Sequence, residues 1–207
     1  TIQCASNQKQ LAVAMFVYTQ QNDDHYAPTW VWYPPLTPSS PPLTWAGVLW
    51  GQGVLGSPLI LGCPSFDEVS PIGLMSQVPL NADPDFWLFT RPHIGYNAYN
   101  IGSRVREEGI NGYLKYNRVQ DVLKPTETIL YTDTRATDSP GQVLGHYAAY
   151  DFNATASGFF LDAVRHRMAL NIAWNDGHVT TTPITDPNDP YADITSVFDT
   201  ENNWDRR

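Results

Sequence analysis

The sequence predicts an α+β fold, in which one long N-terminal helix packs on a small antiparallel β-sheet with long irregular loops between the elements. Two observations predict it. Residues 1–22 have the pattern of a helix, and the chain after residue 90 has the pattern of strands. With 207 residues the chain fits a single domain, so we assign 1–22 to the helix and 23–207 to the sheet and loops.

The N-terminal helix is predicted from an apolar stripe. Residues 1–21 contain no glycine or proline, and Cys4, Leu11, Met15 and Tyr18 follow one another at spacings of seven, four and three. These spacings place the four side chains on one helix face. Asn22-Asp23-Asp24, with Pro28 beyond, marks the end of the helix.

The clearest strands lie in the second half. Thr128–Thr132 is a β-branched and aromatic run that Asp133 should end, and Ala169–Pro183 is a hairpin. Asp176-Gly177 predicts a two-residue turn, which would place Trp174 opposite Val179.

Other segments give weaker signals. Ile94–Ile101 reads as a strand or a wide turn, and Trp45–Trp50 as a short helical turn. Six prolines between residues 28 and 44 predict an extended loop. The tail, 185–207, is rich in Asp, Asn and Pro, and we expect it to be mostly irregular.

Charge excludes some partners. The net charge is −9, so the chain would be repelled by nucleic acid and by anionic membrane surfaces. No apolar run approaches the ~20 residues that a membrane-spanning helix needs.

The two cysteines, Cys4 and Cys63, lack the spacing of a zinc site. An even count with a long separation suits a disulfide formed outside the cytoplasm, and two unrelated buried thiols are the alternative.

Several short motifs occur in the order that one family shows. They are Cys4, Asn7, Lys9-Gln10-Leu11, Tyr18, Asn22-Asp23-Asp24, Cys63-Pro64-Ser65, Gly95-Tyr96-Asn97, and Pro125-Thr126-Glu127-Thr128 with Asp133. The most specific is His166, nine residues, then Asp176-Gly177-His178. This ordered set resembles pseudopilin-like proteins of the type IV pilin and type II secretion superfamily, in the branch with a His-x9-Asp-Gly motif.

The resemblance implies a pilin-like fold and a structural role without enzymatic activity. The protein would be a subunit of a bacterial extracellular or cell-surface filament, tube or secretion pseudopilus, assembling with itself or with other pseudopilins. Members of this family begin with a basic leader, a peptidase site and about twenty apolar residues, so residues 1–22 would be the C-terminal half of a longer helix. Any membrane contact would come through that preceding segment.

The motif residues His166, Asp176 and His178 also form a candidate metal site, with Asp133 as a further ligand, because imidazole and carboxylate suit zinc. Such a site would allow a metal-dependent hydrolase. The alternative is that Asp176-Gly177 is a turn and that the histidines make structural hydrogen bonds.

A candidate calcium site lies in the tail. Asp186, Asn188, Asp189 and Asp193 are oxygen ligands at short spacing, and major pseudopilins of type II secretion carry a calcium loop near the C-terminus. The alternative is a solvated acidic loop.

Five aromatic residues in the proline-rich region are candidates for binding a glycan or a second subunit: Trp30, Trp32, Tyr33, Trp45 and Trp50. A carbohydrate- or surface-binding module is therefore the alternative function. The opposing interpretation is that these side chains fill a satellite core beneath a long loop.

Overall fold

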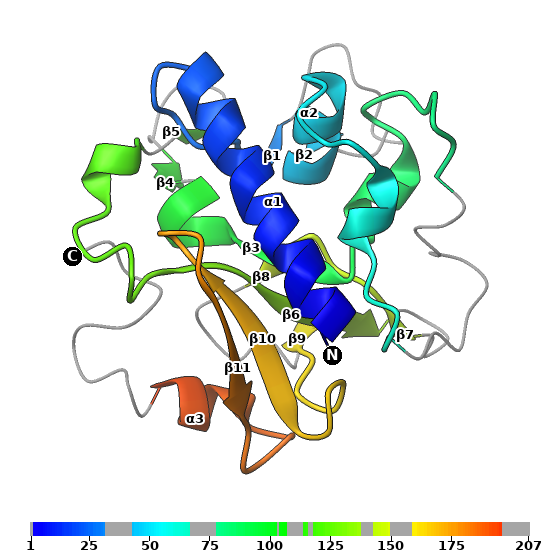
Figure 1. The fold of residues 1–207 in the computed structure, drawn as a ribbon, viewed down its shortest axis with the longest axis vertical. Helices are drawn as coiled ribbons and strands as arrows, with labels where there is room; N and C mark the ends of the chain where they lie inside the picture. The colour runs from blue at the N-terminus through cyan, green and yellow to red at the C-terminus, as the bar shows by residue number, and fades with distance from the viewer. Residues whose placement is uncertain are drawn as a thin grey trace.

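The computed structural model describes residues 2–31, 43–66, 78–102, 104–106, 114–115, 118–137, 143–149 and 159–195. Within them, helix α1 (Ile2–Gln21) lies across a seven-stranded sheet, which confirms the α+β class (Figure 1). The strands of this sheet are β3 (Ile94–Asn97), β6 (Ile129–Thr137), β7 (Val143–Leu144), β8 (Ala148–Ala149), β9 (Phe159–Leu161), β10 (Ala169–Trp174) and β11 (Val179–Pro183).

The sheet is larger than predicted and mixed. Its main path is β11-β10-β6-β3-β8, and β7 and β9 also pair with β6. The prediction of a purely antiparallel sheet is wrong at one edge, since β3 and β8 run parallel.

Smaller elements surround this sheet. Two ladders join β1 (Trp30–Val31) with β2 (Leu43–Thr44) and β4 (Arg104–Arg106) with β5 (Leu114–Lys115). The short helices and helical turns are α2 (Trp45–Gly51), η1 (Pro58–Leu61), η3 (Trp87–Thr90), η4 (Ala98–Gly102), η5 (Val119–Asp121) and α3 (Pro190–Thr195).

The predicted stripe of α1 faces the sheet. Cys4, Leu11, Met15 and Tyr18 are all buried. Asn7 and Gln8 are buried beside them, although both are polar. No helix in the described ranges is long and apolar enough to cross a membrane.

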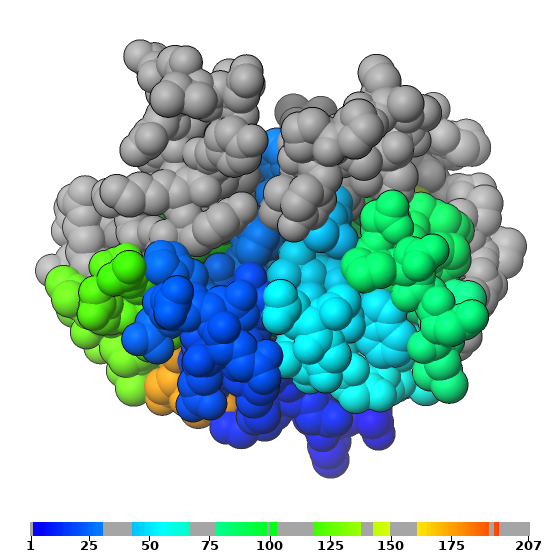
Figure 2. Space-filling view, turned by 90° about the horizontal axis from the view of Figure 1, so that it is seen from above, coloured from blue at the N-terminus to red at the C-terminus, as the bar shows by residue number. Residues whose placement is uncertain are grey.

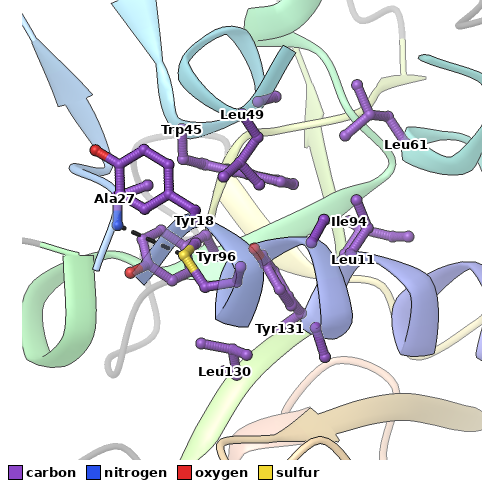
Figure 3. Packing of buried hydrophobic residues seen from close by; sticks show 14 of the residues in the cluster. Leu11, Tyr18, Ala27, Trp45, Leu49, Leu61, Ile94, Tyr96, Leu130 and Tyr131 are labelled. Atoms are coloured by element: carbon purple, nitrogen blue, oxygen red, sulfur yellow. Dashed lines mark hydrogen bonds between the residues drawn. The ribbon is translucent and has the colours of Figure 1, made fainter. Parts of the chain in front are cut away.

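Aromatic side chains fill the core beneath α1 (Figure 3). The ring of Trp45 lies 4.9 Å from that of Tyr131 and 5.9 Å from that of Tyr96, between centroids. All three are fully buried, and burial raises the pKa of both tyrosines well above the usual value. The predicted helical turn at Trp45–Trp50 is therefore confirmed as α2, which packs into this core.

A second apolar cluster covers the opposite face of the sheet. Leu170 and Ile172 of β10 pack there with Ile184 and with Ile194 of α3. The tail predicted as mostly irregular thus contributes a short helix that buries one of its isoleucines.

Strand β6 corrects one prediction. It continues through Asp133 to Thr137 instead of ending at the carboxylate. The charge is tolerated because Asp133 is paired inside the protein, as described below.

The hairpin register also differs from the prediction by one residue. Trp174 lies opposite His178, since its N–H donates to the His178 carbonyl at 2.9 Å, and Val179 pairs with Ala173. Three residues, 175–177, form the turn, and Gly177 has φ +86°. This is the three-residue hairpin loop, in which a left-handed glycine ends a turn.

Candidate functional site

Five polar side chains gather in the interior where α1 crosses β6. Gln8, Asp133, Asp162, Arg165 and His166 are all almost completely buried. We call this group the Asp133 centre. It combines residues from α1, from β6 and from the turn at 162–168.

Asp133 accepts hydrogen bonds from three directions. The Gln8 side-chain amide donates to Oδ1 at 3.2 Å, and the backbone N–H of Asn171 donates to Oδ2 at 2.8 Å. Arg165 Nη1 lies 3.4 Å from Oδ1, and His166 Nε2 lies 3.3 Å from Oδ2. The carboxylate, on β6, therefore contacts α1, β10 and the turn at 162–168.

The guanidinium of Arg165 organises the rest of the centre. It donates to Asp162 at 2.9 Å and to the carbonyls of His93 and Thr134, each at 2.7 Å. Its carbon lies 4.4 Å from the centroid of the Phe66 ring. An arginine that serves so many acceptors uses the planar fork that lysine lacks.

Backbone strain positions this turn. His166, Arg167 and Met168 have φ of +36°, +60° and +64°. Non-glycine residues rarely adopt this region, at a cost of order 1–3 kcal/mol each. The surrounding hydrogen bonds hold the conformation, and it keeps the His166 imidazole in the interior.

The disulfide lies directly beside the centre. Cys4 of α1 and Cys63 of the Cys-Pro-Ser loop are bonded, with their Cα atoms 4.9 Å apart, as the sequence predicted. Nε2 of His166 lies 3.6 Å from Sγ of Cys63. A covalent bond and an ionic network thus join α1, the Cys63 loop and the turn at 162–168 at one place.

The structure separates the two halves of the His-x9-Asp-Gly motif. His166 is in the interior, whereas Asp176 and His178 lie on the hairpin turn, exposed and half-buried respectively. The rest of β10 and the first turn residue separate Asp176 from Asn171, which contacts Asp133, and His166, Asp176 and His178 do not form a group of close ligand atoms among the described residues. A single metal site formed by His166, Asp176 and His178 is therefore not assembled, and that interpretation is corrected.

The hairpin end of the motif is a structural turn docked on α1. Asp176 accepts from the N–H of His178 at 3.0 Å and lies 2.6 Å from its ring nitrogen. Partial burial raises the pKa of Asp176, but these bonds outweigh it and leave that pKa below its ordinary value. Lys9 of α1 donates to the Gly177 carbonyl at 2.5 Å, which fixes the helix over the turn.

The candidate calcium loop is folded on its own hydrogen bonds. Asp193 accepts from the backbone N–H and hydroxyl of Thr185, and these bonds lower its pKa. Asp186 accepts from the N–H of Asn188 at 2.8 Å. In the described part of the chain the three carboxylates of this loop do not form a group within ligand distance of one another, and a calcium site completed by Asn188 and other oxygens stays a prediction.

The aromatic candidates occupy different environments. Trp45 is fully buried and donates its indole N–H to the Tyr147 carbonyl at 2.7 Å, so it cannot contact a sugar. Trp50 donates to the Ala82 carbonyl at 2.8 Å and packs near Phe89. Trp30 is half-buried, and Trp32 and Tyr33 lie outside the described residues. For Trp45 the core interpretation is correct.

Sequence reasoning missed most of the Asp133 centre. The sequence patterns single out Asp133 and His166 but not Arg165, Gln8 or Asp162. One signal was present. Gln8 lies three residues before Leu11 and seven before Met15, on the same buried face of α1. A polar residue on a buried face requires a hydrogen-bond partner.

Comparison of the chain with known proteins gave no match, either to a family model, to a curated protein or to a solved structure.

Proposed function

We propose that this protein is a pseudopilin-like structural subunit that assembles with further copies of itself, or with other pseudopilins, through the outer face of α1. The observation that carries the proposal is the character of that face. It is solvent-exposed, almost free of charge and continuous along the helix.

The outer face of α1 is one stripe. The exposed residues recur at spacings of three and four along the helix, as one face of an α-helix requires: Ile2, Gln3, Ser6, Lys9, Gln10, Val13, Val17, Gln20 and Gln21. Val13 and Val17 are one turn apart and 52% and 37% exposed. A helix of this length spans about 30 Å, enough for extended contact with a second helix.

Charge favours this face as the contact between copies. The whole chain has 21 Asp and Glu residues against 12 Lys and Arg, but α1 contains none of the acidic residues and only Lys9 of the basic ones. Two acidic molecules repel each other, and this repulsion is weakest when the surfaces that come into contact carry no carboxylates. Figure 2 shows α1 in blue at the rim of the molecule, beside the segment that carries α2.

The contacts that hold α1 on the rest of the protein support a role in which the helix transmits mechanical force. The disulfide ties the helix to the Cys63 loop, and the Gln8–Asp133 and Lys9–Gly177 bonds tie it to β6 and to the β10–β11 turn. A bacterial extracellular or cell-surface location is part of the proposal, because oxidising compartments preserve such a disulfide.

The alternative of a glycan-binding module has less support. It rested on five aromatic residues, and Trp45 and Trp50 are used in packing. The remaining argument depends on Trp30, which is half-buried, and on Trp32 and Tyr33.

Substitutions on α1 test the proposal. We expect Val13→Asp/Val17→Asp to abolish concentration-dependent assembly of the protein expressed from its complete gene, measured by sedimentation velocity and electron microscopy. Leu123→Asp is the matched control, because Leu123 is 73% exposed in the loop between η5 and β6. Assembly that survives in the α1 variant, or that is lost equally in the Leu123 variant, would contradict the proposal.

A further inference from the structure

The disulfide and His166 form a compact set of metal-ligand atoms. Cys4, Cys63 and His166 are all buried, and their sulfur and nitrogen atoms lie within 4.8 Å of one another. In the described residues this is the one group of three or more histidine, cysteine and acidic side chains close enough to hold an ion. While the sulfurs are bonded to each other, neither is a thiolate and the set cannot bind a metal.

The distance between His166 and Cys63 matches that between two ligands of one tetrahedral ion. With Zn–S of about 2.3 Å and Zn–N of about 2.0 Å, a sulfur and a nitrogen on one zinc are roughly 3.6 Å apart. Cys63 Sγ and His166 Nε2 are separated by 3.6 Å. Asp133 Oδ2 lies 3.3 Å from His166 Nε2, but Asp133 is not one of the side chains whose ligand atoms all lie within 4.8 Å of one another.

The cysteine loop is held in place by contacts other than the disulfide. Asn7 of α1 donates to the Gly62 carbonyl at 2.7 Å. The N–H of Cys63 donates to His93 Nδ1 at 2.9 Å, and the Phe66 ring stacks on the His93 ring. None of these contacts involves the sulfur–sulfur bond, so its reduction removes none of them directly.

We propose that reduction of the Cys4–Cys63 disulfide converts this cluster into a site for a thiophilic divalent cation such as Zn²⁺. A thiol or dithiol reductant supplies two electrons and two protons, the S–S bond breaks, and the reductant becomes a disulfide. Binding of the cation then displaces both thiol protons. Cys4 and Cys63 bind as thiolates and His166 binds through Nε2, with the Asp133 carboxylate beside that nitrogen.

The sulfurs need only a small movement. They are bonded at about 2 Å in a disulfide and are roughly 3.8 Å apart on a tetrahedral zinc. Rotation about the Cα–Cβ bonds supplies this change while the backbone contacts of Asn7 and His93 remain. The disulfide and the metal are thus alternative cross-links between the same two parts of the chain.

Metal titration of the oxidised and the reduced protein tests the proposal. After reduction with a phosphine, we expect about one equivalent of Co²⁺ to bind with thiolate-to-metal charge-transfer absorption, and Zn²⁺ to displace it. The oxidised protein should bind neither. At 100 times the Kd, Zn²⁺ should raise the unfolding midpoint of the reduced protein by roughly 5–10 °C and leave the oxidised midpoint unchanged.

Variants separate this site from other metal binding. His166→Ala and Cys4→Ser should each lose the charge-transfer signal or weaken binding at least tenfold, whereas His178→Ala should bind as the wild type does, because His178 lies on the distant hairpin. If the reduced protein is unfolded without metal, Zn²⁺ must restore its circular dichroism spectrum. Less than a tenth of an equivalent bound, no refolding, equal binding by oxidised protein, or unchanged binding by His166→Ala would each overturn the proposal.

Discussion

Replacement of Arg165 should destabilise the protein more than any exposed arginine does. The Arg165→Ala substitution removes the partner of Asp133 and of Asp162, both of which are at least 95% buried. Removal of one partner of a buried ion pair typically costs 3–5 kcal/mol, because the remaining charge is left without compensation. The lost donors to the His93 and Thr134 carbonyls act in the same direction, so we expect about 4 kcal/mol.

Two further variants identify the cause of that loss. Arg165→Lys keeps the positive charge but cannot serve these acceptors from one planar group, so we expect a loss of about 2 kcal/mol. Adding Asp162→Asn to Arg165→Ala neutralises one stranded carboxylate and should recover part of the stability. Such a recovery would show coupling between the two side chains, as a double-mutant cycle measures.

The assay is urea unfolding followed by circular dichroism, with the free energy of unfolding obtained by linear extrapolation. Arg167→Ala is the matched control, because Arg167 is exposed two residues away and its removal should change stability by less than about 0.5 kcal/mol. An Arg165→Ala loss below about 1 kcal/mol, or one equal to that of the control, would refute the reasoning.

Three other predictions follow from the same structure. In metal-free buffer Cys4→Ser should lower the free energy of unfolding by about 4 kcal/mol, the chain-entropy value for the 59-residue separation of Cys4 and Cys63, and an unchanged thermal midpoint would contradict it. His146 is buried with its pKa lowered to about 4, chiefly by desolvation. Its unfolded pKa is near 6.5, so its stabilising contribution is present above pH 6.5 and is lost as pH falls toward 4, at up to about 1.4 kcal/mol per pH unit. His146→Gln should therefore flatten the pH dependence of stability in that window, and identical slopes would exclude this group. Gly95→Ala should cost about 1–3 kcal/mol because a Cβ would lie 2.3 Å from Thr134 Cγ2, whereas Gly56→Ala, in open space, should be nearly neutral, and equal effects would contradict this argument.

The sequence predicted the elements whose pattern is local. The stripe of α1 follows from the spacing of Leu11, Met15 and Tyr18, and all three are buried as expected. Apolar residues that recur at helical spacing define the buried face of a helix, whichever element packs against that face. The disulfide was also predicted, from the even number of cysteines and their long separation, and it is present in place of the alternative of two separate thiols.

Features that depend on distant partners were not predictable. Asp133 looked like the end of a strand, but Gln8 and Arg165, remote in sequence, compensate its charge and the strand continues. The left-handed backbone at His166 has no glycine to signal it. The hairpin turn was placed one residue too short, since Asp-Gly fits both two- and three-residue loops and tertiary contacts with α1 select the longer one.

Contact between copies through the outer face of α1 is the central claim, and site-specific photo-cross-linking tests it most directly. A photoreactive phenylalanine analogue would replace Val13 in one preparation and the more exposed Leu123 in another, in protein expressed from the complete gene. We predict covalent dimers for position 13, with the cross-link mapped by mass spectrometry to α1 or its neighbours in a second copy, and only monomer for position 123. Monomer alone from position 13, at concentrations where the wild type sediments as an assembly, would contradict the claim.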